Sequence, residues 1–141
     1  MDAAELLGEW KLISAELTTN GTTTSIYDPK WEFVKMFTKT HFSFLTRLPS
    51  ERAPFSANAT DEELLRGANS FNAGGGRYEL AGADYIEHVQ YCTYPNYEGQ
   101  SIAFKLTFTD GVLTQEGIYP LKRLGFGDSD GYLVESYERL S

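Results

Sequence analysis

Apolar residues in this chain occur in short runs that are rich in β-branched and aromatic side chains, and turn residues separate each run from the next. This pattern is typical of a β-sandwich or a β-barrel. The turn signals include Asn20-Gly21, Gly82-Ala83-Asp84 and Asp110-Gly111. We therefore expect eight strands, over residues 10–17, 31–37, 41–48, 77–80, 85–93, 101–109, 112–119 and 132–140.

One segment has a helical signature. Thr60-Asp61-Glu62-Glu63 is a capping box, in which a Thr cap is followed three residues later by Glu, and it predicts a short helix through about Ala68. Pro49 and Pro54 interrupt the strand pattern just before this segment. Residues 2–7 are compatible with a single additional helical turn.

These elements predict an all-β fold, an eight-stranded antiparallel up-and-down barrel with one short helix. Strands in this order close on themselves and leave no exposed sheet edge. The interior of an eight-stranded barrel is either filled by side chains or holds one small ligand. A half-open sandwich is the structural alternative. At 141 residues the chain has the size of one domain, residues 1–141, and needs no disulfide or metal in order to fold.

The charge of the chain narrows the range of partners. Twenty acidic residues against twelve basic ones give a formal net charge of −8. Nucleic acid and anionic membrane surfaces are therefore not expected as partners, because both are bound by clustered Lys and Arg. No apolar run approaches the roughly 20 residues that span a bilayer. A homodimer is plausible for a small barrel, although no feature of the sequence requires one.

The compartment and the cofactors follow from a few residues. Cys92 is the single cysteine, and a lone thiol suits a reducing compartment. The segment Met1–Glu5 lacks the features of a signal peptide, so we expect a cytoplasmic protein. His41 and His88 are not spaced as a metal pair, and Gly74-Gly75-Gly76 lacks the Lys of a phosphate loop. We therefore expect no cofactor and no metal, and assign the triple Gly to a strand bend or to close backbone approach.

Two features at the ends of the chain resemble lipocalins and the wider calycin group. Gly8-Glu9-Trp10 precedes the first strand and matches the G-x-W signature of these proteins, and Arg139 lies on the last strand. In that group the Trp plugs one end of the barrel and the Arg packs over it. A guanidinium stacked on an indole contributes about 0.5–2 kcal/mol.

The whole chain is similar to the small intracellular lipocalin-like domain family of bacteria and fungi. The matching motifs are Phe37-Thr38, Arg52-Ala53-Pro54-Phe55, the helix from Thr60 to Ala68, Gly76-Arg77-Tyr78-Glu79, His88-Val89, Pro95-Asn96-Tyr97-Glu98-Gly99 and Glu138-Arg139. The resemblance implies the barrel fold, and some relatives are cofactor-free cyclases and isomerases. The chain departs from the family at two positions. It has Glu87 where the family often has His or Thr, and it has Tyr137 where the family often has Trp. Both departures introduce polar atoms at candidate interior positions.

Side-chain alternation sorts each strand into an interior face and a solvent face. If Trp10 points inward, so do Leu12, Ser14 and Glu16. If Arg139 points inward, so do Leu133, Glu135 and Tyr137. Along residues 101–109 the apolar set is expected inside, and it comprises Ile102, Phe104, Leu106 and Phe108.

Two strands leave the phase open. On residues 41–48 either Phe42 and Phe44 face inward, or the alternate set does, which comprises His41, Ser43, Leu45 and Arg47. On residues 85–93 the choice is between His88 with Gln90 and the set Glu87, Val89 and Tyr91. The family motif favours His88 inward.

An apolar chamber with a few polar groups is typical of small-molecule sites. The candidate catalytic residues are Glu135, His88 and Tyr137, because a carboxyl desolvated in such a chamber has a raised pKa and a neighbouring His titrates near neutral pH. Each also has a purely structural interpretation as a hydrogen-bonded strand residue. The candidate ligand-binding residues are Phe33, Met36, Phe44, Tyr78, Tyr91, Phe104, Leu106 and Tyr119.

Three functions are compatible with this pattern. The first is binding of a small, largely apolar metabolite inside the barrel. The second is a cofactor-independent isomerase, cyclase or hydratase-type enzyme that acts on a small apolar intermediate in the same cavity. The third is a structural or interaction module whose interior is filled by side chains. The sequence leaves open whether the protein transforms its ligand.

Overall fold

The computed structural model describes residues 2–141, and across these residues nine antiparallel strands form one sheet. In the sheet they follow the order β2-β1-β3-β4-β5-β6-β7-β8-β9, and an additional pairing between β1 and β9 closes it. The strands are β1 (Gly8–Thr19), β2 (Thr22–Ser25), β3 (Glu32–Phe37), β4 (His41–Arg47), β5 (Phe71–Ala81), β6 (Asp84–Cys92), β7 (Ser101–Thr109), β8 (Val112–Tyr119) and β9 (Gly131–Arg139).

Eight of these strands, β1 and β3–β9, form the closed up-and-down barrel that the sequence predicts, so the half-open sandwich is wrong. The ninth strand, β2, was not predicted. It pairs with the second half of β1, from Glu16 to Thr19, and all four of its residues are exposed. Because β2 has no apolar side chain, it gives no alternation signal. Only its pairing with β1 defines it as a strand.

The triple glycine lies inside a strand rather than before one. β5 begins at Phe71, six residues earlier than predicted, and its register with β6 shifts between Gly75 and Gly76. A Cβ added at Gly76 would lie 1.9 Å from the His88 carbonyl oxygen. The backbones therefore approach too closely for any side chain, as predicted for this motif.

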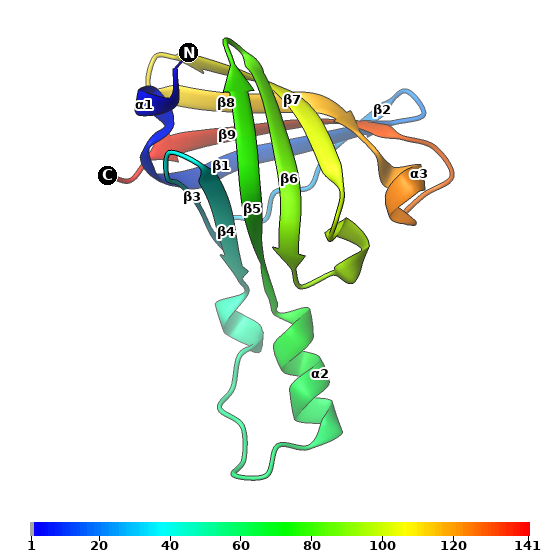
Figure 1. The fold of residues 1–141 in the computed structure, drawn as a ribbon. Coiled ribbons are helices and arrows are strands. Elements are labelled where there is room, and N and C mark those ends of the chain that lie inside the picture. Colours follow the sequence, from blue (N-terminus) through cyan, green and yellow to red (C-terminus); the bar gives the residue numbers. More distant parts are fainter. Residues whose placement is uncertain (1) are drawn as a thin grey trace.

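The helices are short. α2 (Asp61–Asn69) has the predicted capping box, in which the Thr60 hydroxyl accepts from the Glu63 amide and the Glu63 carboxylate accepts from the Thr60 amide. No residue of α2 is buried, and the helix projects beyond the ends of β4 and β5 (Figure 1). α1 (Ala3–Leu6) is the single turn expected near the start, and α3 (Leu121–Leu124) was not predicted. The 3-10 turns η1 (Pro49–Glu51) and η2 (Pro95–Tyr97) complete the elements.

One end of the barrel, next to α1, is closed by packed side chains. Trp10 is fully buried, and its indole Nε1 donates to the Leu6 carbonyl at 2.8 Å. The guanidinium of Arg139 lies 4.2 Å from the Trp10 ring centroid and donates to the Leu7 carbonyl at 2.8 Å. These contacts are the Trp plug and the stacked Arg that the resemblance to lipocalins implies.

A β-bulge corrects the predicted face of β1. The register with β9 shifts between Leu12 and Ser14, so Ala15 faces the core, while Ser14 and Glu16 face solvent. A bulge inserts one extra residue into a strand and thereby exchanges the two faces beyond it. The expectation that Ser14 and Glu16 point inward is therefore wrong.

On two other strands the alternation holds. On β4, Phe42 is buried and Phe44 faces the interior, while Leu45 is 43% exposed, which settles the first open choice. On β7 the predicted inward residues Ile102, Phe104 and Leu106 are buried. Phe108, at the end of β7, is partly exposed and lies edge-on to Trp10 at 5.7 Å.

Among residues 2–141, no helix has the length and apolar character that a membrane crossing requires.

Candidate functional site

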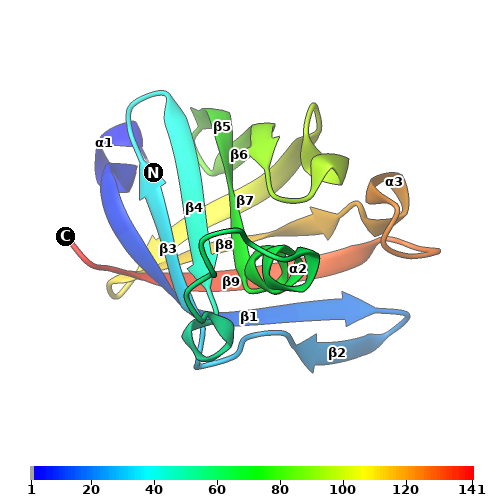
Figure 2. The ribbon, with the colours of Figure 1, turned by 90° about the horizontal axis from the view of Figure 1, so that it is seen from below.

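The barrel contains a cavity of about 360 Å³ at the end opposite the Trp10 plug. Figure 2 views the ring of strands from this side, with α2 nearest the viewer. Natural ligand sites have volumes of about 300–1,000 Å³. A barrel filled completely by its own side chains, the third functional hypothesis, is inconsistent with this volume. The apolar walls of the cavity come from six strands and the loops that join them. They consist of Trp31, Phe33, Phe44, Phe71, Val89, Ile102, Phe104 and Leu133.

The structure brings six of the predicted site residues together at this cavity. Glu135 and Tyr137 project into it from β9, and Tyr119 does so from β8. The other three are the aromatic wall residues Phe33, Phe44 and Phe104. These positions leave the roles predicted for the six residues untested.

Four predicted ligand-binding residues lie away from the cavity. Tyr78 and Leu106 are buried in the core beside the closed end, and Met36 alternates with inward-facing neighbours and so points away. Tyr91 is 68% exposed, because the register shift beside Gly75 turns it outward. These four residues therefore do not line the cavity, contrary to the prediction.

His88 also lies outside the barrel, contrary to the expectation that it points inward. Its Nδ1 is 2.7 Å from the Ser101 hydroxyl, and its Nε2 is 2.5 Å from a carboxylate oxygen of Glu79. Its strand neighbours Glu87 and Val89 are buried, and alternation places His88 on the opposite face. His88 therefore does not line the cavity.

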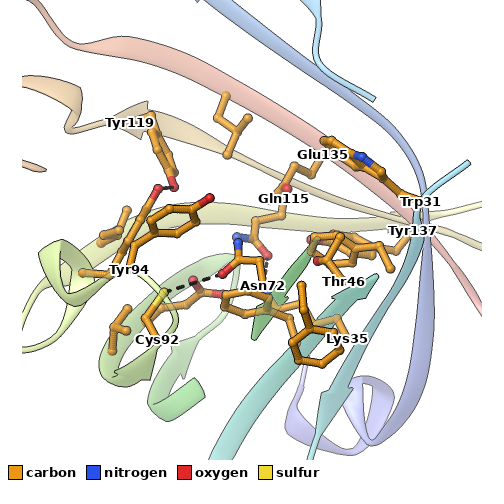
Figure 3. Close-up of a pocket in the computed structure, with 18 of the residues that line it drawn as sticks. Trp31, Lys35, Thr46, Asn72, Cys92, Tyr94, Gln115, Tyr119, Glu135 and Tyr137 are labelled. Atoms are coloured by element: carbon orange, nitrogen blue, oxygen red, sulfur yellow. Dashed lines mark hydrogen bonds and ion pairs between the residues drawn. The ribbon is translucent and has the colours of Figure 1, made fainter. Parts of the chain in front are cut away.

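A buried polar cluster forms the floor of the cavity (Figure 3). Lys35 is only 3% exposed, and its Nζ donates to Glu87 Oε2 and, at 2.7 Å, to Gln115 Oε1. The Tyr85 hydroxyl donates to the same Glu87 oxygen at 2.7 Å. A buried charge is tolerated only when it is paired and hydrogen-bonded, and this cluster meets both conditions.

Four aromatic rings also lie close to the Lys35 ammonium. Its Nζ lies 5.4 Å from the ring centroids of Phe37, Phe42 and Tyr85 and 5.7 Å from that of Tyr137. A cation near the faces of several rings is attracted by their quadrupoles, most strongly where water is excluded.

Sequence reasoning did not identify Lys35 or Gln115. Lys35 alternates with Phe33 and Phe37 on β3, and this in-phase spacing was the signal that could have placed a lysine inside. Gln115 pairs directly with Glu135 across β8 and β9, so an inward Glu135 implies an inward Gln115. Lys35 and Gln115, two polar residues at inward-facing strand positions, therefore lie at the floor of the cavity.

Glu135 is the titratable group whose environment best suits proton transfer. Burial raises its pKa from 4.5 to about 7. The positive charge of Lys35 and the Tyr137 hydroxyl oppose this rise, whereas the negative charge of Glu87 adds to it. A carboxyl with a pKa near 7 is present in both protonation states at neutral pH, which suits a general acid or base.

The mouth of the cavity carries further polar groups. The hydroxyls of Tyr97 and Tyr119 lie 2.5 Å apart, and burial raises the pKa of both. Burial also raises the pKa of the Cys92 thiol, which therefore stays protonated and weakly nucleophilic. The buried Thr46 hydroxyl has no hydrogen-bond partner within residues 2–141.

Among the residues that the structure describes, no group of three or more His, Cys, Asp or Glu side chains is arranged to hold a metal ion.

The comparisons with known proteins concern the fold. A family model described as a lipocalin-like domain matches residues 7–139. A crystal structure of a lipocalin-like protein from Bacteroides uniformis ATCC 8492 is 15% identical, with a TM-score of 0.50 over 96% of this chain and 99% of that one. A protein from Bacteroides eggerthii DSM 20697, titled uncharacterized, is 13% identical, with a TM-score of 0.43 over 94% and 99% of the two chains. No curated protein matches the chain significantly.

Proposed function

Because the chain belongs to the family of lipocalin-like domains, we propose that its barrel binds one small, largely apolar molecule inside the cavity. The observation that carries this proposal is a cavity of about 360 Å³ whose walls are aromatic and aliphatic and whose floor is polar. Each apolar Å² removed from water contributes about 25 cal/mol. Wall residues such as Phe33, Phe104 and Leu133 therefore provide affinity, and the few polar groups on the floor orient the ligand.

A second candidate function rests on Glu135. A carboxyl with a pKa of about 7 beside the Tyr137 hydroxyl would favour a cofactor-independent isomerase, cyclase or hydratase-type enzyme acting in the same cavity. The Glu135 carboxylate would remove a proton from the bound molecule and return it elsewhere, while the walls hold a reactive conformer. In that case Glu135→Gln abolishes turnover and leaves binding in place.

Native mass spectrometry distinguishes the two candidates. The protein is incubated with a small-molecule extract of the organism that makes it, and the extract is analysed before and after. A bound mass with the extract otherwise unchanged supports the binding protein. A metabolite replaced by one of equal mass, or by one that differs by a water, supports the enzyme. If no fraction of the extract yields a bound or converted metabolite, both candidates are overturned.

Two neighbouring positions on β6 provide a matched pair of variants for this experiment. Val89→Phe enlarges a side chain that lines the cavity, and His88→Phe places the same phenyl ring on the outer face. We expect Val89→Phe to reduce the bound fraction at least about tenfold, because its added ring occupies the ligand's space. His88→Phe should bind as the wild type does, with circular dichroism confirming that both variants are folded.

A further inference from the structure

The charges that line the cavity are unbalanced. Among the described residues that line it, the side chains with a formal charge are one lysine, Lys35, and two glutamates, Glu87 and Glu135. Lys35 forms its ion pair with Glu87, so these two charges largely cancel. Glu135 is then the acidic group in excess, and the cavity becomes electronegative whenever Glu135 is ionised.

Lys35 is poorly placed to hold an anionic ligand. Its ammonium already donates to Glu87 and Gln115, and four aromatic rings surround it within 5.7 Å. A ligand carboxylate that reached the third N–H of this ammonium would lie beside two other carboxyls, those of Glu87 and Glu135. Like charges close together in a site of low dielectric constant disfavour each other strongly.

Glu135, by contrast, lies on the cavity wall with its carboxyl among groups from three other strands and a turn. The polar or charged groups that bear on it are Lys35 from β3, Glu87 from β6, Gln115 and Tyr119 from β8, Tyr137 from its own strand and Tyr97 from η2. In this set Lys35 is the cation, and it is already paired. A second cation placed in the cavity would therefore meet a carboxylate that it could neutralise.

From this arrangement we infer that the cavity selects a molecule that ends in a basic amine over one that ends in a carboxylate. This inference rests on the proposed binding function. The amine would lie at Glu135, and its apolar body would extend along the aromatic walls, including Phe33, Phe44 and Phe104. Ammonium groups are attracted both to carboxylates and to the faces of aromatic rings.

The same arrangement predicts how amine affinity varies with pH. An ammonium binds the ionised form of Glu135, whose pKa without ligand is about 7. Below that pKa the carboxyl is protonated and must release its proton on binding. Between about pH 6 and about pH 8 the ionised fraction rises about tenfold, and the affinity for an amine that stays protonated should rise by the same factor. A neutral ligand should show no such dependence.

Three probes that share one carbon skeleton test the inference by isothermal titration calorimetry. Phenylbutylamine is cationic, phenylbutanol is neutral and phenylbutyrate is anionic. At about pH 8 we expect the amine to bind about tenfold or more tightly than the alcohol, and the carboxylate to bind more weakly than the alcohol. At about pH 6 the amine should lose about tenfold in affinity, while the alcohol changes little.

A pair of variants on β9 assigns the effect to one carboxyl. Glu135→Gln should abolish the preference for the amine and its pH dependence while the alcohol still binds. Glu138→Gln makes the same change on the exposed face of the strand and should behave as the wild type does. If the alcohol binds but the amine binds no better, or the carboxylate binds most tightly, the charge inference is overturned. If no probe binds at either pH, the proposed binding function itself is overturned.

Discussion

The two ends of this barrel are built from the same strands and differ in what fills them. Next to α1 the interior is solid, with Trp10, Leu12 and Leu113 packed almost without exposure and Arg139 stacked on the Trp10 ring. At the opposite end the walls are also aromatic, yet they enclose about 360 Å³. The Lys35 cluster lies between the packed core and this cavity.

The difference arises from side-chain volume rather than from strand geometry. β5 passes the cavity with Gly74 opposite Phe44 and Cys92, both of which line it, and so contributes no side chain at that level. The neighbouring wall positions Thr46 and Ser70 are small. An alternating pattern thus predicts which residues face inward, whereas the sizes of those residues decide whether the interior is solid or hollow.

The largest effect is expected from breaking the cluster between the two ends. Lys35→Met leaves Glu87 buried without its cation, and removing one partner of a buried pair costs about 3–5 kcal/mol. Lys105→Met removes an exposed pair with Asp84, which is worth about 0–1 kcal/mol. Urea denaturation measures the unfolding free energy of both variants. Equal losses of unfolding free energy would show that the buried pair contributes no more to stability than the exposed one.

Two Leu→Ala variants compare the ends directly. Leu113 lies in the solid end with no exposed surface, and Leu133 lines the cavity. We expect Leu113→Ala to lower the unfolding free energy by about 3 kcal/mol and Leu133→Ala by about half as much. A side chain beside an existing void has fewer partner atoms to lose. A larger loss for Leu133→Ala in chemical denaturation would mean that the second end is packed as well as the first.

Glu135 should make the hollow end sensitive to pH. Its pKa rises from 4.5 in the unfolded chain to about 7 in the fold, so between these values the folded state binds more protons and stability falls as pH rises. Glu135→Gln removes this loss. The unfolding free energy of the variant, relative to wild type, should rise by about 2–3 kcal/mol from about pH 5 to about pH 8. Parallel stability curves for the two proteins would show that Glu135 keeps an ordinary pKa.

The smallest effect is expected at the cavity wall. The buried Thr46 hydroxyl has no hydrogen-bond partner in the described part of the chain, and an unsatisfied buried group costs about 1–3 kcal/mol. Thr46→Val replaces the hydroxyl with a methyl group and should stabilise the protein by about 1 kcal/mol. Thr107→Val, on the exposed face of β7, is the control and should be neutral. Destabilisation by Thr46→Val in thermal melts would show that the hydroxyl is satisfied in solution.

Much of the solid end could be predicted from the sequence, because its signals are local. The resemblance of Gly8-Glu9-Trp10 and Arg139 to the lipocalin signature implies the Trp plug, and alternation on residues 101–109 gives the inward face of β7. The capping box at Thr60 likewise predicts α2 without reference to the rest of the chain. By contrast, β2 has no apolar side chain to mark it, although it pairs locally with β1 across the Asn20-Gly21 turn, and the first half of β5 is defined by its pairing with β4.

The inward-facing residues of the hollow end are harder to predict from the sequence, because strands contain inserted residues and because one interior side chain is charged. The bulge after Leu12 and the shift beside Gly75 each exchange the faces of a strand, which moves Glu16 and Tyr91 to the outside. Because a lysine on a strand is usually solvated, the sequence alone does not place Lys35 in the interior. Its burial becomes favourable through the partners contributed by β6 and β8, Glu87 and Gln115, and through the aromatic rings around its ammonium.

Under the proposed function a small molecule binds at the hollow end and not at the solid one, and the two tryptophans provide one reporter for each end. Trp31 lines the cavity, whereas the Trp10 indole is buried in the plug with its Nε1 hydrogen-bonded to Leu6. Both indole N–H signals are followed by ¹H–¹⁵N NMR while phenylbutanol is titrated into the protein. We predict a saturable shift of the Trp31 signal with the Trp10 signal unchanged. A titration that moves neither signal, or only that of Trp10, would contradict the claim.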